Sequence, residues 1–137
     1  MVDENIVVDA VCRYLEKAGF EIKQRRTTTQ RGEDIIAISK QANETLWIEA
    51  KGGTSSRKGS ARFNKPYTAS QVFDRVSKGL YTAVVLREKH AGNDESIGLA
   101  FPDAKPFTRL LTPIAATLKK LNLRVYLVSE DCHVRLL

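Results

Sequence analysis

Apolar residues recur with a helical period near the start of the chain. The positions at i, i+3, i+4, i+7, i+8 and i+11 are Val7, Ala10, Val11, Tyr14, Leu15 and Ala18. This spacing predicts a helix over residues 4–18 with one apolar face. Gly19 follows at the position where helices commonly end on glycine.

Three segments with the pattern of strands come next. Residues 20–26 alternate apolar and charged positions, and residues 35–38 are a continuous apolar run. Such a run is typical of a strand covered on both faces. Residues 46–51 follow a polar turn at 41–44, so the second and third segments are expected to form a hairpin.

The next segment, residues 52–67, is rich in glycine, serine and positive charge and predicts a loop longer than the usual connection. Residues 68–71 read Thr-Ala-Ser-Gln, the T-x-x-Q form of a capping box, and predict a helix whose apolar stripe runs to Leu80. Residues 81–86, Tyr-Thr-Ala-Val-Val-Leu, predict a buried strand. A polar linker over 87–96 and a strand over 97–101 complete this region.

The C-terminal part predicts one helix and two strands. An apolar stripe from Leu110 to Leu121 forms the helix, which Pro113 either kinks or restarts. Residues 123–128 and 133–137 are the closing strands. The order α-β-β-β-α-β-β-α-β-β predicts an α/β sandwich with a mixed sheet. A length of 137 residues corresponds to one domain.

Composition narrows the class of protein. Apolar residues make up 42% of the chain and charged residues 28%, which excludes disordered, collagen-like and disulfide-scaffold proteins. No stretch approaches the ~18 apolar residues of a membrane span, and the acidic first residues differ from a secretory signal. Cys12 and Cys132 have neither disulfide-framework nor zinc spacing. We expect an intracellular, cytoplasmic protein without a membrane partner, with the nucleoid as one location.

Positive charge is concentrated in the central third. The net charge is −3 over residues 1–22, +6 over residues 23–67 and +3 over residues 68–137. The basic residues of two runs without any acid are Lys23, Arg25, Arg26, Arg31, Arg57, Lys58, Arg62 and Lys65. Clustered Lys and Arg attract DNA through counterion release. A solvated basic surface is the alternative interpretation of the same charge.

Candidate chemistry is found at the ends of the second and third predicted strands. Asp34 precedes the run 35–38, and Glu49 and Lys51 lie two apart and therefore on one strand face. Two carboxylates brought together by a hairpin suit Mg²⁺, and a neighbouring lysine can orient a water and stabilise a charged transition state. A surface ion pair at a strand end is the simpler alternative.

This arrangement resembles the PD-(D/E)XK nuclease superfamily, whose restriction-endonuclease-like fold is a three-layer sandwich with an αβββαβ core. The resemblance covers residues 4–86 as the core and leaves 87–137 as a C-terminal β-α-β-β extension. It implies metal binding by Asp34, Glu49 and the backbone carbonyl of Ala50, with Lys51 as the lysine of the motif. Glu33 stands in place of the proline. The Gly-x-Asp form is similar to Mrr-like restriction enzymes and archaeal Holliday junction resolvases.

Accessory residues have two interpretations each. Gln71 resembles a glutamine that many members place near the metal, but it also fits the capping box. Arg75 and Lys78 follow it at i+4 and i+7, a stripe suited to a phosphate backbone. Many members carry an acid on the first helix, and Glu4, on the extended apolar face, is a better candidate than Asp9. An acid that stabilises the helix N-terminus is the alternative role for Glu4.

The remaining residues favour structural roles. His90 and His133 are expected to lack a partner for metal binding or general-base work. Cys12 is expected to be packed, whereas Cys132 lies in a turn with nothing to mark it as a nucleophile. Trp47 shares a strand face with Glu49, so it either helps wall the site or packs in the core.

Together these features predict an Mg²⁺- or Mn²⁺-dependent DNA endonuclease of the restriction, repair or junction-resolving type. One domain presents one active site, so cutting both strands requires a homodimer or two successive events. The alternative is a non-catalytic nucleic-acid-binding module that retains the fold. A small enzyme unrelated to nucleic acid is disfavoured by the basic central third.

Overall fold

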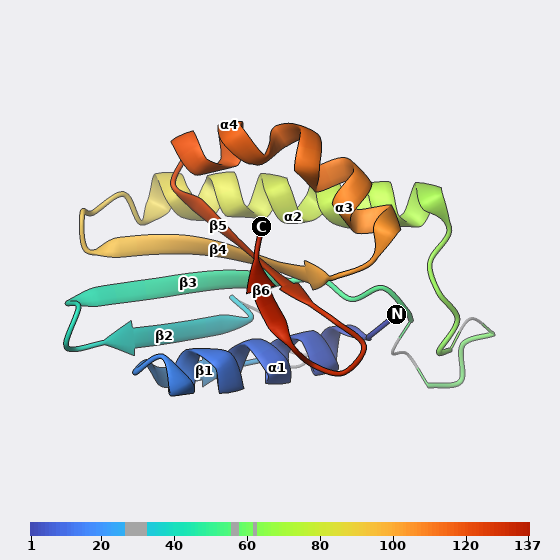
Figure 1. Cartoon of the computed structure of the whole chain (residues 1–137), viewed down its shortest axis with the longest axis horizontal. Helices are drawn as coiled ribbons and strands as arrows, with labels where there is room; N and C mark the ends of the chain where they lie inside the picture. Colours follow the sequence, from blue (N-terminus) through green and yellow to red (C-terminus); the bar gives the residue numbers. More distant parts are fainter. Residues whose placement is uncertain (27–32, 56–57, 62) are drawn as a thin grey trace.

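A six-stranded mixed sheet forms the centre of the molecule (Figure 1). The computed structural model describes residues 1–26, 33–55, 58–61 and 63–137. In their order across the sheet the strands are β1 (Glu21–Arg25), β2 (Ile35–Ser39), β3 (Glu44–Ala50), β4 (Glu95–Pro102), β5 (Leu123–Val128) and β6 (Val134–Leu136). The pairs β3–β4 and β4–β5 are parallel and the others antiparallel. The expected α/β class with a mixed sheet is confirmed.

Helices cover both faces of the sheet (Figure 1). They are α1 (Glu4–Lys17) on one face, and on the other α2 (Ala69–Lys89), α3 (Lys105–Leu111), the 3-10 turn η1 (Thr112–Ile114) and α4 (Ala115–Lys120). Side chains alternate along each strand, so in β4 Ala100 packs under α1 whereas its neighbour Leu99 packs under α2. Within the described residues, no helix combines the length and hydrophobicity needed to cross a membrane.

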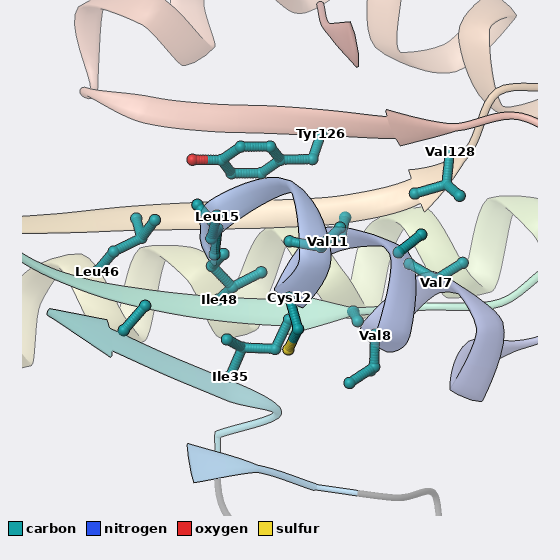
Figure 2. Packing of buried hydrophobic residues seen from close by; sticks show 14 of the residues in the cluster. Val7, Val8, Val11, Cys12, Leu15, Ile35, Leu46, Ile48, Tyr126 and Val128 are labelled. Carbon is teal, nitrogen blue, oxygen red and sulfur yellow. The ribbon is translucent and has the colours of Figure 1, made fainter. Parts of the chain in front are cut away.

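The first helix forms as its sequence pattern predicts. Asp3 caps it by accepting a hydrogen bond from the backbone N–H of Ile6 at 2.9 Å. Gly19 follows the last turn with φ of 93°, a left-handed conformation that glycine adopts without strain. The apolar face of α1 lies over side chains of β2, β3 and β5, as Figure 2 shows. This packing places the N-terminus of α1 close to the point where β2 begins and β3 ends.

The strand expected over residues 81–86 is wrong, because α2 continues without a break to Lys89. The buried residues of α2 keep one helical period across the expected boundary and are Val72, Val76, Gly79, Ala83 and Leu86. Val84 and Val85 are 50% and 45% exposed, unlike residues of a buried strand. Short apolar runs fit both helix and strand, and here the capping box and the length of the periodic stripe favour the helix.

The fourth strand of the order α-β-β-β-α-β is therefore β4, and the remainder is α3, η1, α4, β5 and β6 rather than β-α-β-β. The capping box is confirmed: Thr68 and Gln71 exchange hydrogen bonds between side chain and backbone. Pro113 lies in the 3-10 turn between α3 and α4, so it interrupts and restarts the helix. Helical structure begins at Lys105, earlier than the apolar stripe from Leu110 predicts.

Candidate functional site

Asp34, Glu49 and Lys51 lie together where β2 begins and β3 ends. The backbone N–H of Ala50 donates a hydrogen bond to Oδ2 of Asp34 at 2.7 Å. The Nζ of Lys51 forms an ion pair with Oε1 of Glu49. Asp34 and Glu49 are buried and Lys51 is half-buried. A carboxylate pair with an adjacent ammonium group is thus held where β2 begins and β3 ends.

Strand register explains why these residues meet. β2 and β3 are antiparallel with Ile35 opposite Ile48, so the residue before β2 lies beside the last residues of β3. The backbone carbonyl of Asp34 also accepts a hydrogen bond from the N–H of Arg26 at 2.8 Å. The acidic side chain is therefore positioned from both of its neighbouring strands.

The electrostatic environment keeps Asp34 partly protonated near neutral pH. Burial is the largest cause that raises its pKa from the usual 3.8 to about 7, and the charge of Glu49 is the next. The N–H of Ala50 and the charge of Lys51 act in the opposite direction. A buried acid whose charged form is opposed by a second acid is typical of functional sites.

Glu4 joins this cluster from the first turn of α1. Burial raises the pKa of Glu4, and the charges of Lys51 and Arg75 oppose the rise. Glu49 raises it as well, whereas the backbone N–H of Gly52 donates to the Glu4 carboxylate and lowers it. Glu4 thus both occupies the helix N-terminus and faces the site. Asp9 lies elsewhere and pairs with Arg25 at 2.9 Å.

Gly52 permits this approach of α1 to the end of β3. A Cβ placed on Gly52 would lie 2.3 Å from the backbone nitrogen of Glu4 and 2.7 Å from the carbonyl carbon of Asp3. Both atoms belong to the backbone and cannot rotate away. A glycine directly after Lys51 is therefore required for the N-terminus of α1 to reach the carboxylate cluster.

We expect Gly52→Ala to lower the free energy of unfolding by about 1–3 kcal/mol, because the added methyl group forces the α1 N-terminus away. Gly92→Ala is the matched control, since its Cβ would meet the carboxylate oxygens of Asp94 at 2.9 Å and Glu95 at 3.1 Å, which are the ends of side chains that can move. Urea titrations of both variants measure the difference. A Gly52→Ala variant as stable as Gly92→Ala would contradict the close approach.

The donor set of this cluster suits a hard cation. Among the described residues, no three His, Cys, Asp or Glu side chains form a group suited to a metal ion. Mg²⁺, however, binds through one or two carboxylates and keeps several waters, so Asp34 and Glu49 are sufficient donors. The negative charge of Glu49 contributes to the raised pKa of Asp34, and a bound cation would offset the repulsion between the two carboxylates. The ligand role of the Ala50 carbonyl stays a prediction.

A cavity of about 280 Å³ opens between Glu49 and the C-terminal half of α2. Its lining residues are Glu33, Glu49, Tyr81, Thr82, Val85, Leu86 and Lys89. The α2 wall is largely apolar and the opposite wall carries carboxylates. Sequence reasoning missed this cavity because it placed residues 81–86 in a strand.

Gln71, Arg75 and Lys78 lie along α2 as the stripe predicts. The Oε1 of Gln71 accepts from the N–H of Thr68 at 2.9 Å, so this oxygen serves the capping box. Arg75 donates to the hydroxyl of Tyr67 at 3.0 Å and lies 4.9 Å from the centre of its ring. Its charge acts on Glu4, which places Arg75 beside the cluster. Lys78 is exposed.

The basic residues of the two acid-free runs differ from one another in burial and in ion pairing. Lys23 pairs with Glu21 at 2.9 Å, and Arg25 holds β1 to α1 through Asp9 and Glu16. Arg26 is half-buried next to Asp34, whereas Lys58 and Lys65 are exposed. The remaining three, Arg31, Arg57 and Arg62, lie outside the described residues. DNA contacts by all of these stay predictions.

His90 and His133 both have partners, so the expectation that they lack one is wrong. His90 stacks on Trp47 with ring centroids 3.7 Å apart, and its Nδ1 lies 2.8 Å from Oε2 of Glu95. The indole N–H of Trp47 donates to the same carboxylate oxygen at 3.1 Å. His133 lies 2.8 Å from Asp131 on the surface. The turn between α2 and β4 brings His90 to Glu95, which a linear pattern does not reveal.

Trp47 lies on the same face of β3 as Glu49, and there it contacts His90 and Glu95. Its ring packs against the core under α2 and fixes the end of that helix to the sheet. Cys12 is buried in α1 as expected, and Cys132 is half-buried in the turn before β6.

Comparison of the chain with protein-family models, with curated proteins and with solved structures finds no match.

Proposed function

We propose that this protein is a metal-dependent DNA endonuclease that hydrolyses phosphodiester bonds at the Asp34–Glu49–Lys51 cluster. The observation that carries the proposal is the convergence of two buried carboxylates and one ammonium group at the end of β3. Such a cluster is costly for folding unless its charges are paired or bound to something; Lys51 pairs with Glu49, and a bound cation would compensate the second carboxylate, Asp34. The basic central third of the sequence supports a polyanionic substrate.

Each residue has a role that follows from its chemistry. Asp34 and Glu49 would hold Mg²⁺ or Mn²⁺, which when bound neutralises charge on the scissile phosphate and lowers the pKa of a water. Lys51 would orient the attacking water and stabilise the charge that develops on the phosphate oxygens. Glu4 would add negative charge to the same site, and Arg75 would face the phosphate backbone.

The order of elements supports membership of the PD-(D/E)XK superfamily and its restriction-endonuclease-like fold. The chain runs α1, β1, β2, β3, α2, β4, with Asp34 at the start of the second strand and Glu49 in the third. Under this proposal the αβββαβ core extends from Glu4 to Pro102 rather than to residue 86. The segment α3 to β6 adds two strands to the sheet and short helices to the face that α2 covers.

A cleavage assay on supercoiled plasmid and on branched DNA tests the proposal. We expect nicked or linear products in Mg²⁺ or Mn²⁺ and none in EDTA. DNA binding without cleavage of any substrate would instead favour the non-catalytic binding module.

DNA affinity should fall steeply with salt if the loop between β3 and α2 binds phosphates. Replacing Arg57, Lys58, Arg62 and Lys65 together with alanine is expected to weaken binding to all sequences alike. The slope of log affinity against log salt should fall by about 0.9 for each phosphate that the loop no longer neutralises. Fluorescence anisotropy at several salt concentrations measures this slope.

A matched control removes the same charge from the helices α3 and α4. The exposed residues for this variant are Lys105, Arg109, Lys119 and Lys120. The control should keep the wild-type slope, since net charge alone does not determine which phosphates are bound. Equal slopes for the two variants would contradict phosphate binding by the loop between β3 and α2.

A further inference from the structure

We propose that Tyr81 stacks on an unpaired base of the substrate strand, so that the site acts on DNA with unpaired bases beside the scissile phosphate. This inference rests on the proposed nuclease function and names the substrate class for the same site. Tyr81 is 73% exposed in the middle of α2, so most of its ring is open to contact with a ligand. It also lines the cavity that contains Glu49.

Tyr81 stands beside a row of residues on one side of α2. Arg75, Lys78, Thr82, Val85 and Lys89 recur at i, i+3, i+7, i+10 and i+14 and therefore share that side. The last three of them line the cavity with Tyr81. Cations thus lie before and after Tyr81 on the cavity side of α2, whereas the exposed acids Asp74 and Glu88 lie seven residues before and after it on its own outward line. Basic residues that follow a backbone and aromatic rings that stack on bases are the two features of single-strand recognition.

The chemistry of the cavity distinguishes a base from a phosphate. The carboxylates of Glu33 and Glu49 line it together with the ammonium group of Lys89, so without metal the net negative charge of the lining disfavours a phosphate inside. An uncharged ring is not repelled, and the amino groups of bases can donate hydrogen bonds to carboxylates. The apolar side chains of Val85 and Leu86 suit the face of such a ring. The base would enter the cavity while its phosphates lie along Lys78 and Arg75.

A continuous duplex does not offer this contact. Paired bases are stacked on their neighbours, and their faces are reached only when the base is unstacked or the strand is single. A tyrosine on a rigid helix cannot insert between stacked pairs without local opening. Single strands, flaps and gaps therefore fit Tyr81 better than intact duplex does.

A protein partner or a second copy of the chain is the competing occupant. Phe73 is 58% exposed on the same helix, and Val84 and Val85 are half-exposed, so an apolar strip is available. Asp74 and Glu88 are exposed on the outward line of α2. The cations on the cavity side and the position of Tyr81 beside Glu49 favour nucleic acid, and the experiment below separates the two.

The test measures binding in EDTA, so that catalysis does not enter. The probe is an oligodeoxythymidylate with one 2-aminopurine, used alone and annealed to its complement. Tyr81→Ala is expected to weaken single-strand binding about tenfold to 100-fold, with little change for duplex. The wild-type protein should quench 2-aminopurine fluorescence, and Tyr81→Ala should not. Tyr81→Phe keeps the ring and should bind and quench like wild type.

Phe73→Ala is the matched control, because it removes an exposed aromatic ring from the side of α2 away from the cavity. It should retain wild-type binding. Wild-type single-strand affinity in Tyr81→Ala, or an equal loss for duplex, would overturn the inference. So would a wild-type dimer in sedimentation that Tyr81→Ala converts to monomer with unchanged DNA affinity.

The outcomes for stacking and for catalysis are separable. Duplex cleavage by the wild type that Tyr81→Ala leaves unchanged, without quenching in EDTA, would reject stacking and leave the nuclease proposal intact. Tyr81-dependent quenching in a protein that cleaves no DNA would support stacking and reject the nuclease.

Discussion

A Glu49→Gln variant is expected to lose metal-dependent DNA cleavage by at least about 100-fold while its affinity for DNA holds or rises slightly. The substitution keeps the size and hydrogen bonding of the side chain but removes the charge that attracts Mg²⁺. Charge stabilisation by a metal contributes several kcal/mol to such a transition state. Affinity is expected to rise because a carboxylate repels phosphate until a cation arrives. Plasmid nicking rates and anisotropy titrations measure the two effects.

Lys51→Ala tests a different part of the same site. Its rate should fall about 100- to 1,000-fold, the cost of losing one group that stabilises transition-state charge. Its response to Mg²⁺ concentration should change less than that of Glu49→Gln. Because Lys51 forms the ion pair with Glu49, its removal leaves that carboxylate without its cation and more available to metal.

Equal cleavage by wild type and Glu49→Gln would show that the activity comes from a contaminant or another site. Asp34→Asn should behave like Glu49→Gln, since both act through one metal site. Loss of binding together with cleavage in Glu49→Gln would contradict the assignment of this residue to catalysis alone. Circular dichroism of each variant confirms that it is folded.

Asp34→Asn is expected to stabilise the metal-free protein above pH 7. The pKa of Asp34 is about 7 in the folded state against 3.8 ordinarily, so between these values the unfolded chain has released a proton that the folded chain keeps. Stability from this group is therefore full below about pH 4, declines as pH rises and is lost above about pH 7. The difference between these two pKa values corresponds to a change of about 4 kcal/mol at most in the free energy of unfolding.

Urea titrations in EDTA between pH 4 and pH 8 measure this effect as the difference between variant and wild type. The advantage of Asp34→Asn should be small near pH 4 and grow to about 2–4 kcal/mol at pH 8. Asp74→Asn, at an exposed position of α2, is the control and should show a small difference at every pH. An advantage of Asp34→Asn that is independent of pH would contradict burial and repulsion by Glu49 as its cause.

Local pattern was sufficient for most elements of the fold. The periodicity of α1, the apolar run of β2 and the capping box of α2 are each formed by neighbouring residues, and the structure has all three. The shared face of Glu49 and Lys51 also follows from their spacing alone, because strand side chains alternate. Asp34 could be paired with them because a hairpin brings adjacent strands into register.

Residues 81–86 are the clearest failure of local pattern. Their apolar and β-branched side chains suit a strand and a helix alike, so the sequence of this segment does not decide between them. The decision depends on packing: Ala83 and Leu86 continue the buried stripe of α2 under which β4 lies. This error also hid Tyr81 and the cavity beside Glu49.

The sequence by itself determined the α/β class, the hairpin of β2 and β3, and the pairing of acid and lysine at its end, because each depends on short-range periodicity. Only the tertiary structure decided that Glu4 reaches the cluster, since this requires α1 to pack on the sheet with its N-terminus against Gly52. It likewise decided that His90 meets Trp47 and Glu95, and that Tyr81 stands exposed beside Glu49. Residues far apart in the chain meet only where packed layers leave them room, and no linear spacing encodes that geometry.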